Sequence, residues 1–179
     1  MNKNTLNLGL VVAIVGILVF LLMVILEPGM FMMSALGLIG FAAAIIVPII
    51  FIRKERSQRG GFITFGEAFK LSFFGLAIGG AIAAVFQILY TGVIDPDFGE
   101  RMTAKTLEFS NQFMEGAMSD EQREEILRQT EADAMERWEL MGQIQSFGIA
   151  LILYAVLSLI LAAVLKKNPD TENAQTLDS

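Results

Sequence analysis

The chain has 179 residues, of which 54% are hydrophobic, and a formal net charge of -6 at pH 7. It contains no cysteine and no histidine, which excludes disulfide bonds, thiolate nucleophiles, imidazole bases and the usual zinc sites. The apolar residues stand in long blocks and not at the period of roughly 3.6 or 2 residues of a water-facing helix or strand, so the composition indicates an integral membrane protein.

Four of these blocks carry no charged residue: 4–26, 28–52, 71–94 and 140–165. Each can cross a hydrocarbon core of roughly 30 Å, which takes about 20 residues at about 1.5 Å of rise per residue. We therefore predict an all-α fold, an integral membrane four-helix bundle with an extracytoplasmic helical hairpin between the third and fourth spans. The predicted segments are spans at about 6–26, 30–52, 68–94 and 142–165, an outer helical loop at 95–141, a single membrane domain at 1–168 and a disordered tail at 169–179.

A cleaved signal peptide is the alternative interpretation of the first span, because Lys3 precedes an apolar run. The run is longer than the apolar core of a signal peptide, and no small-x-small cleavage site follows it before the second apolar block. We therefore expect the first helix to be retained.

The connection between the second and third spans indicates the orientation. It contains Arg53, Lys54, Arg56 and Arg59. Short loops with an excess of Lys and Arg stay on the cytoplasmic side, and Lys3 and Lys166-Lys167 agree with that placement. We predict that both termini are cytoplasmic and that the acidic loop is extracytoplasmic.

The segment before the third span has the pattern of a helix N-terminus. Thr64 stands three residues before Glu67, the spacing of a capping box, in which each side chain bonds the backbone N–H of the other residue. This structural role explains Glu67, so we assign it no catalytic role.

Small residues recur at four-residue spacing along the third span, at Gly75, Gly79 and Ala83. Such a stripe lets two helix backbones approach closely in lipid. We expect it to pack within one bundle, and homodimerisation through the stripe is the alternative.

A few polar residues lie within the spans near their outer ends. The candidate polar cluster is Gln87 and Thr91 in the third span with Gln145 and Ser146 in the fourth. Hydrogen bonds between the two helices would satisfy these groups and are the expected role. A substrate site between the third and fourth spans is the alternative.

The outer loop carries two further helix starts and most of the acidic charge. Asp97 with Glu100 and Ser119 with Gln122 have the spacing of N-cap pairs, and we expect the second helix to run unbroken into the fourth span. Calcium is an alternative near Asp97, but the spacing does not match an EF-hand, so no metal site is expected. Residues 95–142 hold 13 acidic and 5 basic side chains. We interpret the acidic residues from Asp120 to Glu139 as the solvated face of the second helix, with a docking surface for a basic protein partner as the alternative.

Three segments together resemble one known family. They are Gly61-Phe62-Ile63-Thr64-Phe65-Gly66-Glu67-Ala68-Phe69-Lys70, Ile94-Asp95-Pro96-Asp97-Phe98 and Ala162-Ala163-Val164-Leu165-Lys166-Lys167. The family is a group of bacterial membrane proteins catalogued as domain of unknown function 4199. The resemblance runs over essentially the whole chain and implies four spans, an acidic helical outer loop and the inner membrane of a Gram-negative bacterium in the Bacteroidota. It implies no activity, ligand or catalytic residue.

The span interiors lack Asp, Glu, Lys and Arg, which argues against an ion-coupled pump and against an aspartyl-type intramembrane protease. No nucleophile–base pair or metal cluster can be assembled, so we expect no enzymatic activity and no cofactor. We expect a multi-pass membrane protein with a structural, scaffold or interaction role, and a small transporter or lipid-handling protein is the alternative. The expected partner is the lipid bilayer, with a protein at the acidic loop and a second copy of the chain as the alternatives, and no nucleic acid is expected.

Overall fold

The computed structural model describes residues 2–115 and 118–168. Within these ranges the chain forms six α-helices and a short π-helix, η1. Their bounds are α1 (Lys3–Leu26), α2 (Met30–Gln58), α3 (Phe65–Leu89), η1 (Tyr90–Ile94), α4 (Phe98–Met114), α5 (Asp120–Trp138) and α6 (Leu140–Leu165). Four helical segments, α1, α2, α3 continued by η1, and α6, are long and apolar enough to cross a membrane. The predicted disordered tail, 169–179, lies outside the described residues.

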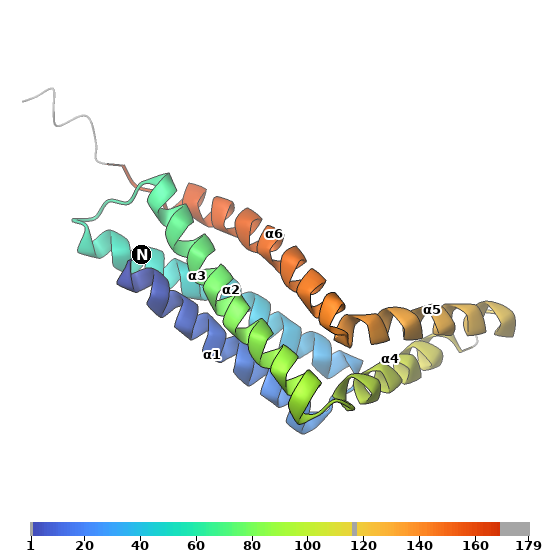
Figure 1. Ribbon diagram of the computed structural model, residues 1–179. Coiled ribbons are helices and arrows are strands. Elements are labelled where there is room, and N and C mark those ends of the chain that lie inside the picture. The colour runs from blue at the N-terminus through green and yellow to red at the C-terminus, as the bar shows by residue number, and fades with distance from the viewer. Residues whose placement is uncertain (1, 116–117, 169–179) are drawn as a thin grey trace, which may run out of the picture.

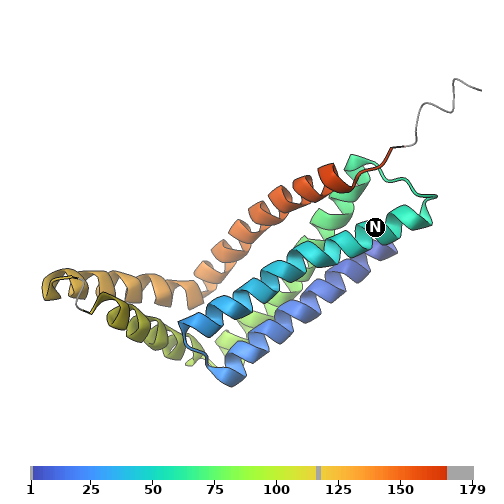
Figure 2. The same ribbon diagram turned by 180° about the vertical axis from the view of Figure 1, so that it is seen from behind.

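The four long helices lie side by side, and α3 packs against each of the other three (Figure 1). Helices α4 and α5 pack against each other and extend from one end of this bundle, whereas the start of α1 and the end of α6 lie at the opposite end (Figure 2). We call the end with α4 and α5 the acidic end. The opposite end, with Lys3, Lys70, Lys166 and the last turns of α2, is the basic end.

Two clusters of buried apolar side chains hold the helices together. The cluster at the basic end consists of Leu8, Ile52, Ile63, Ala68, Leu71, Leu161 and Ala162. At the acidic end the ring of Phe20 lies 5.4 Å from Tyr90 and 5.7 Å from Phe98, and Phe98 lies 5.2 Å from Trp138, all measured between ring centroids. These edge-to-face contacts fix α4 and the end of α5 onto α1 and α3.

Helices α1 and α3 approach each other closely because small residues face each other. A Cβ atom added at Gly79 would lie 2.6 Å from the carbonyl oxygen of Gly9, and one added at Gly16 would lie 3.0 Å from Ala83. Gly75 is also buried against α1. The stripe of Gly75, Gly79 and Ala83 therefore packs against α1 of the same chain, which leaves no room on this face for a second copy.

The expectation of an unbroken helix from the outer loop into the fourth span is wrong. Glu139 has extended backbone, with φ -66° and ψ 154°, and separates α5 from α6. The chain turns so sharply here that a Cβ atom added at Gly142 would lie 2.8 Å from the carbonyl carbon of Glu136. The side-chain amide of Gln143 donates to the carbonyl of Trp138 at 2.7 Å, which satisfies a group that the break leaves without its helical partner.

The ends of α3 also differ from the predicted bounds. The helix begins at Phe65, directly after its Thr64 cap, and it closes in η1, where the N–H of Asp95 donates to the carbonyl of Tyr90 at 2.8 Å. This bond joins residues five positions apart, whereas an α-helical bond joins residues four positions apart. The last turn is therefore a π-helical turn with one extra residue, and Pro96 follows it and ends the helix. α2 continues to Gln58, because the charged side chains of its last turns need no apolar environment.

Candidate functional site

A cavity of about 280 Å³ lies between α3, α6 and α1, near the acidic end. Its polar lining consists of Gln87, Arg137, Gln143, Ser146 and Tyr154. Small and aromatic side chains of the three helices form the remaining wall. This cavity is where polar side chains of the third and fourth spans meet.

A hydrogen-bonded chain joins α3 to α6 at this cavity. The Nε2 atom of Gln143 donates to Oγ1 of Thr91 at 3.0 Å, and that hydroxyl donates to the backbone carbonyl of Gln87 at 3.0 Å. Gln143 is 7% exposed, and its Oε1 atom has no partner among the described residues. The bond between α3 and α6 therefore satisfies Thr91 completely and Gln143 only in part.

The four residues of the predicted polar cluster are not all together. Gln87 and Ser146 line the cavity, and Thr91 bonds to Gln143 beside them. Gln145 lies instead in a separate depression, next to Asp133. Gln143 and Gln145 are two positions apart, which at about 100° per residue places them on nearly opposite sides of α6, so only one of them can face α3.

Sequence reasoning missed Gln143 and Tyr154 as members of this site. Together with Ser146 and Ala150 they follow the spacing 3, 4, 4 along the fourth span, which places all four on one helix face. A Cβ atom added at Gly80 would lie 2.9 Å from the Cε2 atom of Tyr154, so the absence of a side chain at Gly80 gives the tyrosine ring its place on α3.

Several polar groups of the cavity have no partner in the described part of the chain: the side-chain amide of Gln87, the hydroxyl of Tyr154 and the guanidinium of Arg137. Gln87 and Tyr154 are half-buried and Arg137 is exposed, so a bound molecule can reach all three groups. The cavity thus offers hydrogen-bond donors, acceptors and one cationic group to a bound molecule.

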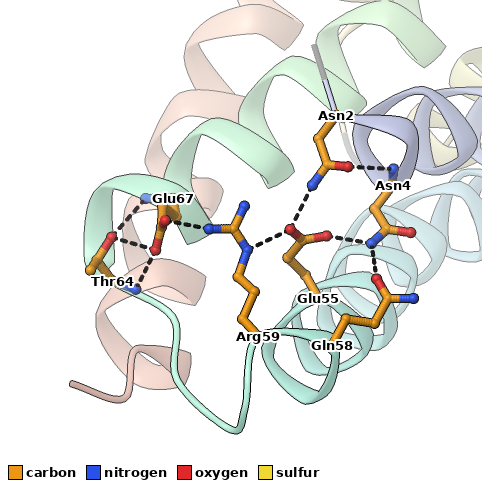
Figure 3. Close-up of polar contacts among 7 residues, drawn as sticks. All are labelled: Asn2, Asn4, Glu55, Gln58, Arg59, Thr64 and Glu67. Atoms are coloured by element: carbon orange, nitrogen blue, oxygen red, sulfur yellow. Dashed lines mark hydrogen bonds and ion pairs between the residues drawn. The ribbon is translucent and has the colours of Figure 1, made fainter. Parts of the chain in front are cut away.

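A second polar assembly lies at the basic end and links three helices (Figure 3). Glu55 of α2 is 5% exposed, and its carboxylate accepts from Nδ2 of Asn2 at 2.6 Å, from Nδ2 of Asn4 and from Nε of Arg59 at 2.6 Å. Arg59 also donates to Glu67 of α3. This assembly joins the first turn of α1, the end of α2 and the start of α3.

The capping box of α3 is part of the same assembly. Glu67 accepts from the backbone N–H of Thr64 at 2.9 Å, and the Thr64 hydroxyl accepts from the N–H of Glu67 at 3.4 Å. The hydrogen bond from Arg59 to Glu55, with a smaller contribution from Glu67, raises the pKa of the Arg59 guanidinium above its ordinary value. The sequence pattern indicated the cap itself, but nothing in it connected Glu55 with Asn2 and Asn4, which lie more than 50 positions away.

Arg101 of α4 fixes the acidic end to the spans. Its Nε atom donates to Glu27, in the turn after α1, at 2.7 Å, and its two terminal nitrogens donate to the carboxylate of Asp95 at 3.0 and 2.7 Å. These hydrogen bonds from Arg101 hold the pKa of Asp95 below its ordinary value. Lys105 donates to the backbone carbonyl of Glu27, which has a left-handed φ of 38°.

The two predicted helix caps of the outer loop differ in outcome. Asp97 occupies the N-cap position of α4, but its side chain makes no capping bond, because its backbone is helical with φ -81° and ψ -6° and not extended. The prediction of a capping Asp97 is therefore wrong. At the start of α5 the Ser119 hydroxyl accepts from the N–H of Gln122 at 3.4 Å.

An open groove of about 620 Å³ lies between α4 and α5. Its apolar floor is formed by Ala104, Leu107 and Leu127. Three carboxylates also line it, those of Glu108, Glu124 and Glu131, and none has an ion-pair partner in the described ranges. Arg128 lines the groove too, but it pairs with Glu125 at 2.5 Å. The groove therefore combines apolar surface with uncompensated negative charge.

Comparison with known proteins connects the chain to one family. A family model described as "Protein of unknown function (DUF4199)" matches residues 7–167, a range that includes the described helices from the second turn of α1 onward. No curated protein and no solved structure matches the chain.

Proposed function

Because the chain belongs to the family of proteins of unknown function (DUF4199), whose description names no activity, we propose a role from its own surfaces: a non-enzymatic interaction protein of the bacterial inner membrane. In this proposal both termini are cytoplasmic, α4 and α5 form an extracytoplasmic hairpin, and the groove between them docks a basic segment of a partner protein. The observation that carries the proposal is the set of three unpaired carboxylates, Glu108, Glu124 and Glu131, around an apolar floor.

The physical reason is charge complementarity combined with apolar contact. Residues 95–142 hold 13 acidic and 5 basic side chains, so the field around the groove attracts cationic segments and repels acidic ones. Leu107 and Leu127 supply apolar area that a partner side chain can cover. Helices that present an apolar groove commonly receive an amphipathic segment in this way.

The test is photo-crosslinking of the full-length protein in cells of its source organism. A photoreactive residue at Leu127, inside the groove, should give discrete adducts with a partner, and one at the neighbouring exposed Ile126, outside the groove, should give far fewer. The adducts should be lost in the triple variant Glu108→Gln, Glu124→Gln, Glu131→Gln. They should persist in the matched triple variant Glu100→Gln, Glu115→Gln, Glu121→Gln, which removes the same charge from α4, from the residue that follows it and from α5, outside the groove.

A second candidate function is the binding of a small amphiphile in the cavity between α3 and α6. The unpartnered groups at Gln87, Gln143 and Tyr154 favour it, because a ligand with hydroxyl or amide groups would supply the missing hydrogen bonds. Arg137 would hold an anionic group of such a ligand. This arrangement supports lipid handling or transport more than a purely structural contact.

Mass spectrometry of small molecules that co-purify with the full-length protein tests the second candidate. Ala84→Leu fills the cavity and should remove a species that the wild type retains. Ala42→Leu adds the same volume at an exposed position of α2 and should retain it. Equal retention by both variants, or no retained species in the wild type, would argue against a binding site there.

A further inference from the structure

An open cavity of about 410 Å³ lies at the basic end, between the first turns of α1 and α3 and below the end of α2. Its charged rim consists of Glu55, Arg59, Glu67 and Lys70. Its apolar wall is formed by Leu71 and Phe74 of α3. The cavity is separate from the one between α3 and α6 and from the groove between α4 and α5.

The groups still available on the rim are donors of hydrogen bonds. The carboxylates of Glu55 and Glu67 already accept from Asn2, Asn4, Thr64 and Arg59. Arg59 uses its Nε atom and one terminal nitrogen for these bonds, and its second terminal nitrogen carries none (Figure 3). The ammonium of Lys70 has no hydrogen-bond or ion-pair partner in the described ranges. Two cationic donors, from Arg59 and Lys70, are thus left to face a ligand.

The surroundings of the cavity are basic as well. Within residues 2–94 and 161–168, the segments outside the acidic loop, the basic side chains are Lys3, Arg53, Lys54, Arg56, Arg59, Lys70, Lys166 and Lys167. Among the described residues of this end, the acidic side chains are Glu55 and Glu67. Basic residues beside membrane-spanning helices attract anionic lipids near the membrane surface. The field at this end therefore favours an anionic ligand.

The depth of the cavity corresponds to the headgroup region of a bilayer. Lys70 follows the first residue of the α3 span, Phe65, by five positions, or about 7.5 Å along the helix at about 1.5 Å per residue. Phe74 lies one further turn into the span and is 48% exposed beside the cavity. A cationic rim above an exposed apolar wall matches the order of phosphate and acyl chain in a phospholipid.

From these observations we infer that the cavity binds an anionic glycerophospholipid of the leaflet at the basic end, with its phosphate on Lys70 and Arg59 and its acyl chain along Leu71 and Phe74. The network of Glu55 and Glu67 holds Arg59 at the rim and more than balances its charge, so the guanidinium offers a free hydrogen-bond donor and no net positive charge. Lys70 is the residue that contributes an unshared positive charge. This inference depends on the membrane location of the four spans and not on the docking role of α4 and α5.

Native mass spectrometry of the full-length protein in detergent tests the inference. The protein is titrated with phosphatidylglycerol, phosphatidylethanolamine and phosphatidylcholine of identical acyl chains, and separately with glycerol phosphate. Phosphatidylglycerol should be retained at least several-fold better than the two zwitterionic lipids. Lys70→Gln should weaken its retention about tenfold, because one charge-assisted hydrogen bond to phosphate is lost.

Two matched variants make the result specific. Lys54→Gln removes the same charge from the same end but not from the cavity, and it should change retention less than twofold. Glu67→Gln keeps the capping box, since glutamine also serves at this position, but releases Arg59 from one carboxylate and should strengthen retention.

Three outcomes would overturn the inference. Equal losses of phosphatidylglycerol retention in Lys70→Gln and Lys54→Gln would show that the overall positive charge of the basic end, and not the cavity, binds the lipid. Equal retention of all three lipids would remove the role of charge. Retention of glycerol phosphate as strong as that of phosphatidylglycerol would assign the cavity to a soluble anion and not to a lipid.

Discussion

At the scale of single residues, Gly142 decides the path of the chain between α5 and α6. A Cβ atom at this position would lie 2.8 Å from the carbonyl carbon of Glu136 and 3.0 Å from the Cα atom of Arg137, and both contacts are with backbone. Backbone atoms cannot move aside as the end of a flexible side chain can. The bend at Glu139 therefore depends on a residue without a side chain at Gly142.

Gly142→Ala should destabilise the folded protein by about 1–3 kcal/mol, the usual cost of overpacking a tight contact. Gly148→Ala is the matched control, because it lies in the same helix and a Cβ atom there would meet nothing within 4 Å. Thermal unfolding in detergent, followed by circular dichroism, measures both. Equal midpoints for the two variants would contradict the role of Gly142.

The contact between Asp95 and Arg101 makes the attachment of α4 sensitive to acid. The pKa of Asp95 lies below its ordinary value of 3.8, because Arg101 bonds to the ionised carboxylate. Stability from this contact is therefore present above pH 3.8 and is lost as the pH falls through the lowered pKa of Asp95.

Asp95→Asn should consequently lower the unfolding midpoint at pH 6 and have progressively less effect below pH 3.8. The fluorescence of the single tryptophan, Trp138, reports the transition, since its ring packs on Phe98 of α4. A difference between variant and wild type that stays constant down to pH 2 would show that the ionised carboxylate contributes nothing.

At the scale of elements, the small residues of α3 and those of α2 have different surroundings. Gly75 and Gly79 are covered by α1, whereas Cβ atoms added at Gly37 or Gly40 of α2 would meet nothing within 4 Å. Glycines therefore accompany a tight helix crossing in one span and an open surface in another. Composition alone could not distinguish them, because the partner of α3 is set by the packing order of the helices.

Gly79→Ala should destabilise the bundle by about 1–3 kcal/mol, because its Cβ atom would lie 2.6 Å from the backbone carbonyl of Gly9. Gly40→Ala should be neutral for unfolding of the monomer. Thermal unfolding and the oligomeric state by multi-angle light scattering are measured together. A change of oligomeric state in Gly40→Ala would show that α2 forms the contact of a homo-oligomer. A Gly40→Ala monomer that is less stable than the wild type would contradict the observed packing.

At the scale of the whole molecule, charge is separated along the axis of the bundle. The acidic end carries α4 and α5, and the basic end carries eight of the 13 basic side chains of the chain. The start of α1 and the end of α6 lie together at the basic end, as an even number of membrane crossings requires (Figure 1). An excess of Lys and Arg on one side orients membrane proteins with that side in the cytoplasm.

The absence of cysteine makes the chain a natural background for labelling experiments on this orientation. Gln112→Cys, on the exposed surface of α4, should react in intact cells with a maleimide that cannot cross the membrane. Ser57→Cys, exposed near the end of α2, should react only after the cells are permeabilised. The reverse pattern would place the termini outside.

The sequence by itself determined the four spans, the charge at each end and the capping pair of Thr64 and Glu67, because these depend on composition and on neighbours within a few residues. Only the tertiary structure decided that Gln143 and not Gln145 meets Thr91, that Glu55 is buried among the side chains of α1, and that the chain breaks at Glu139. Each of these features depends on atoms that come from distant parts of the sequence or on a backbone contact across a bend. Periodicity places a residue on a helix face, but only the packing of helices determines what that face meets.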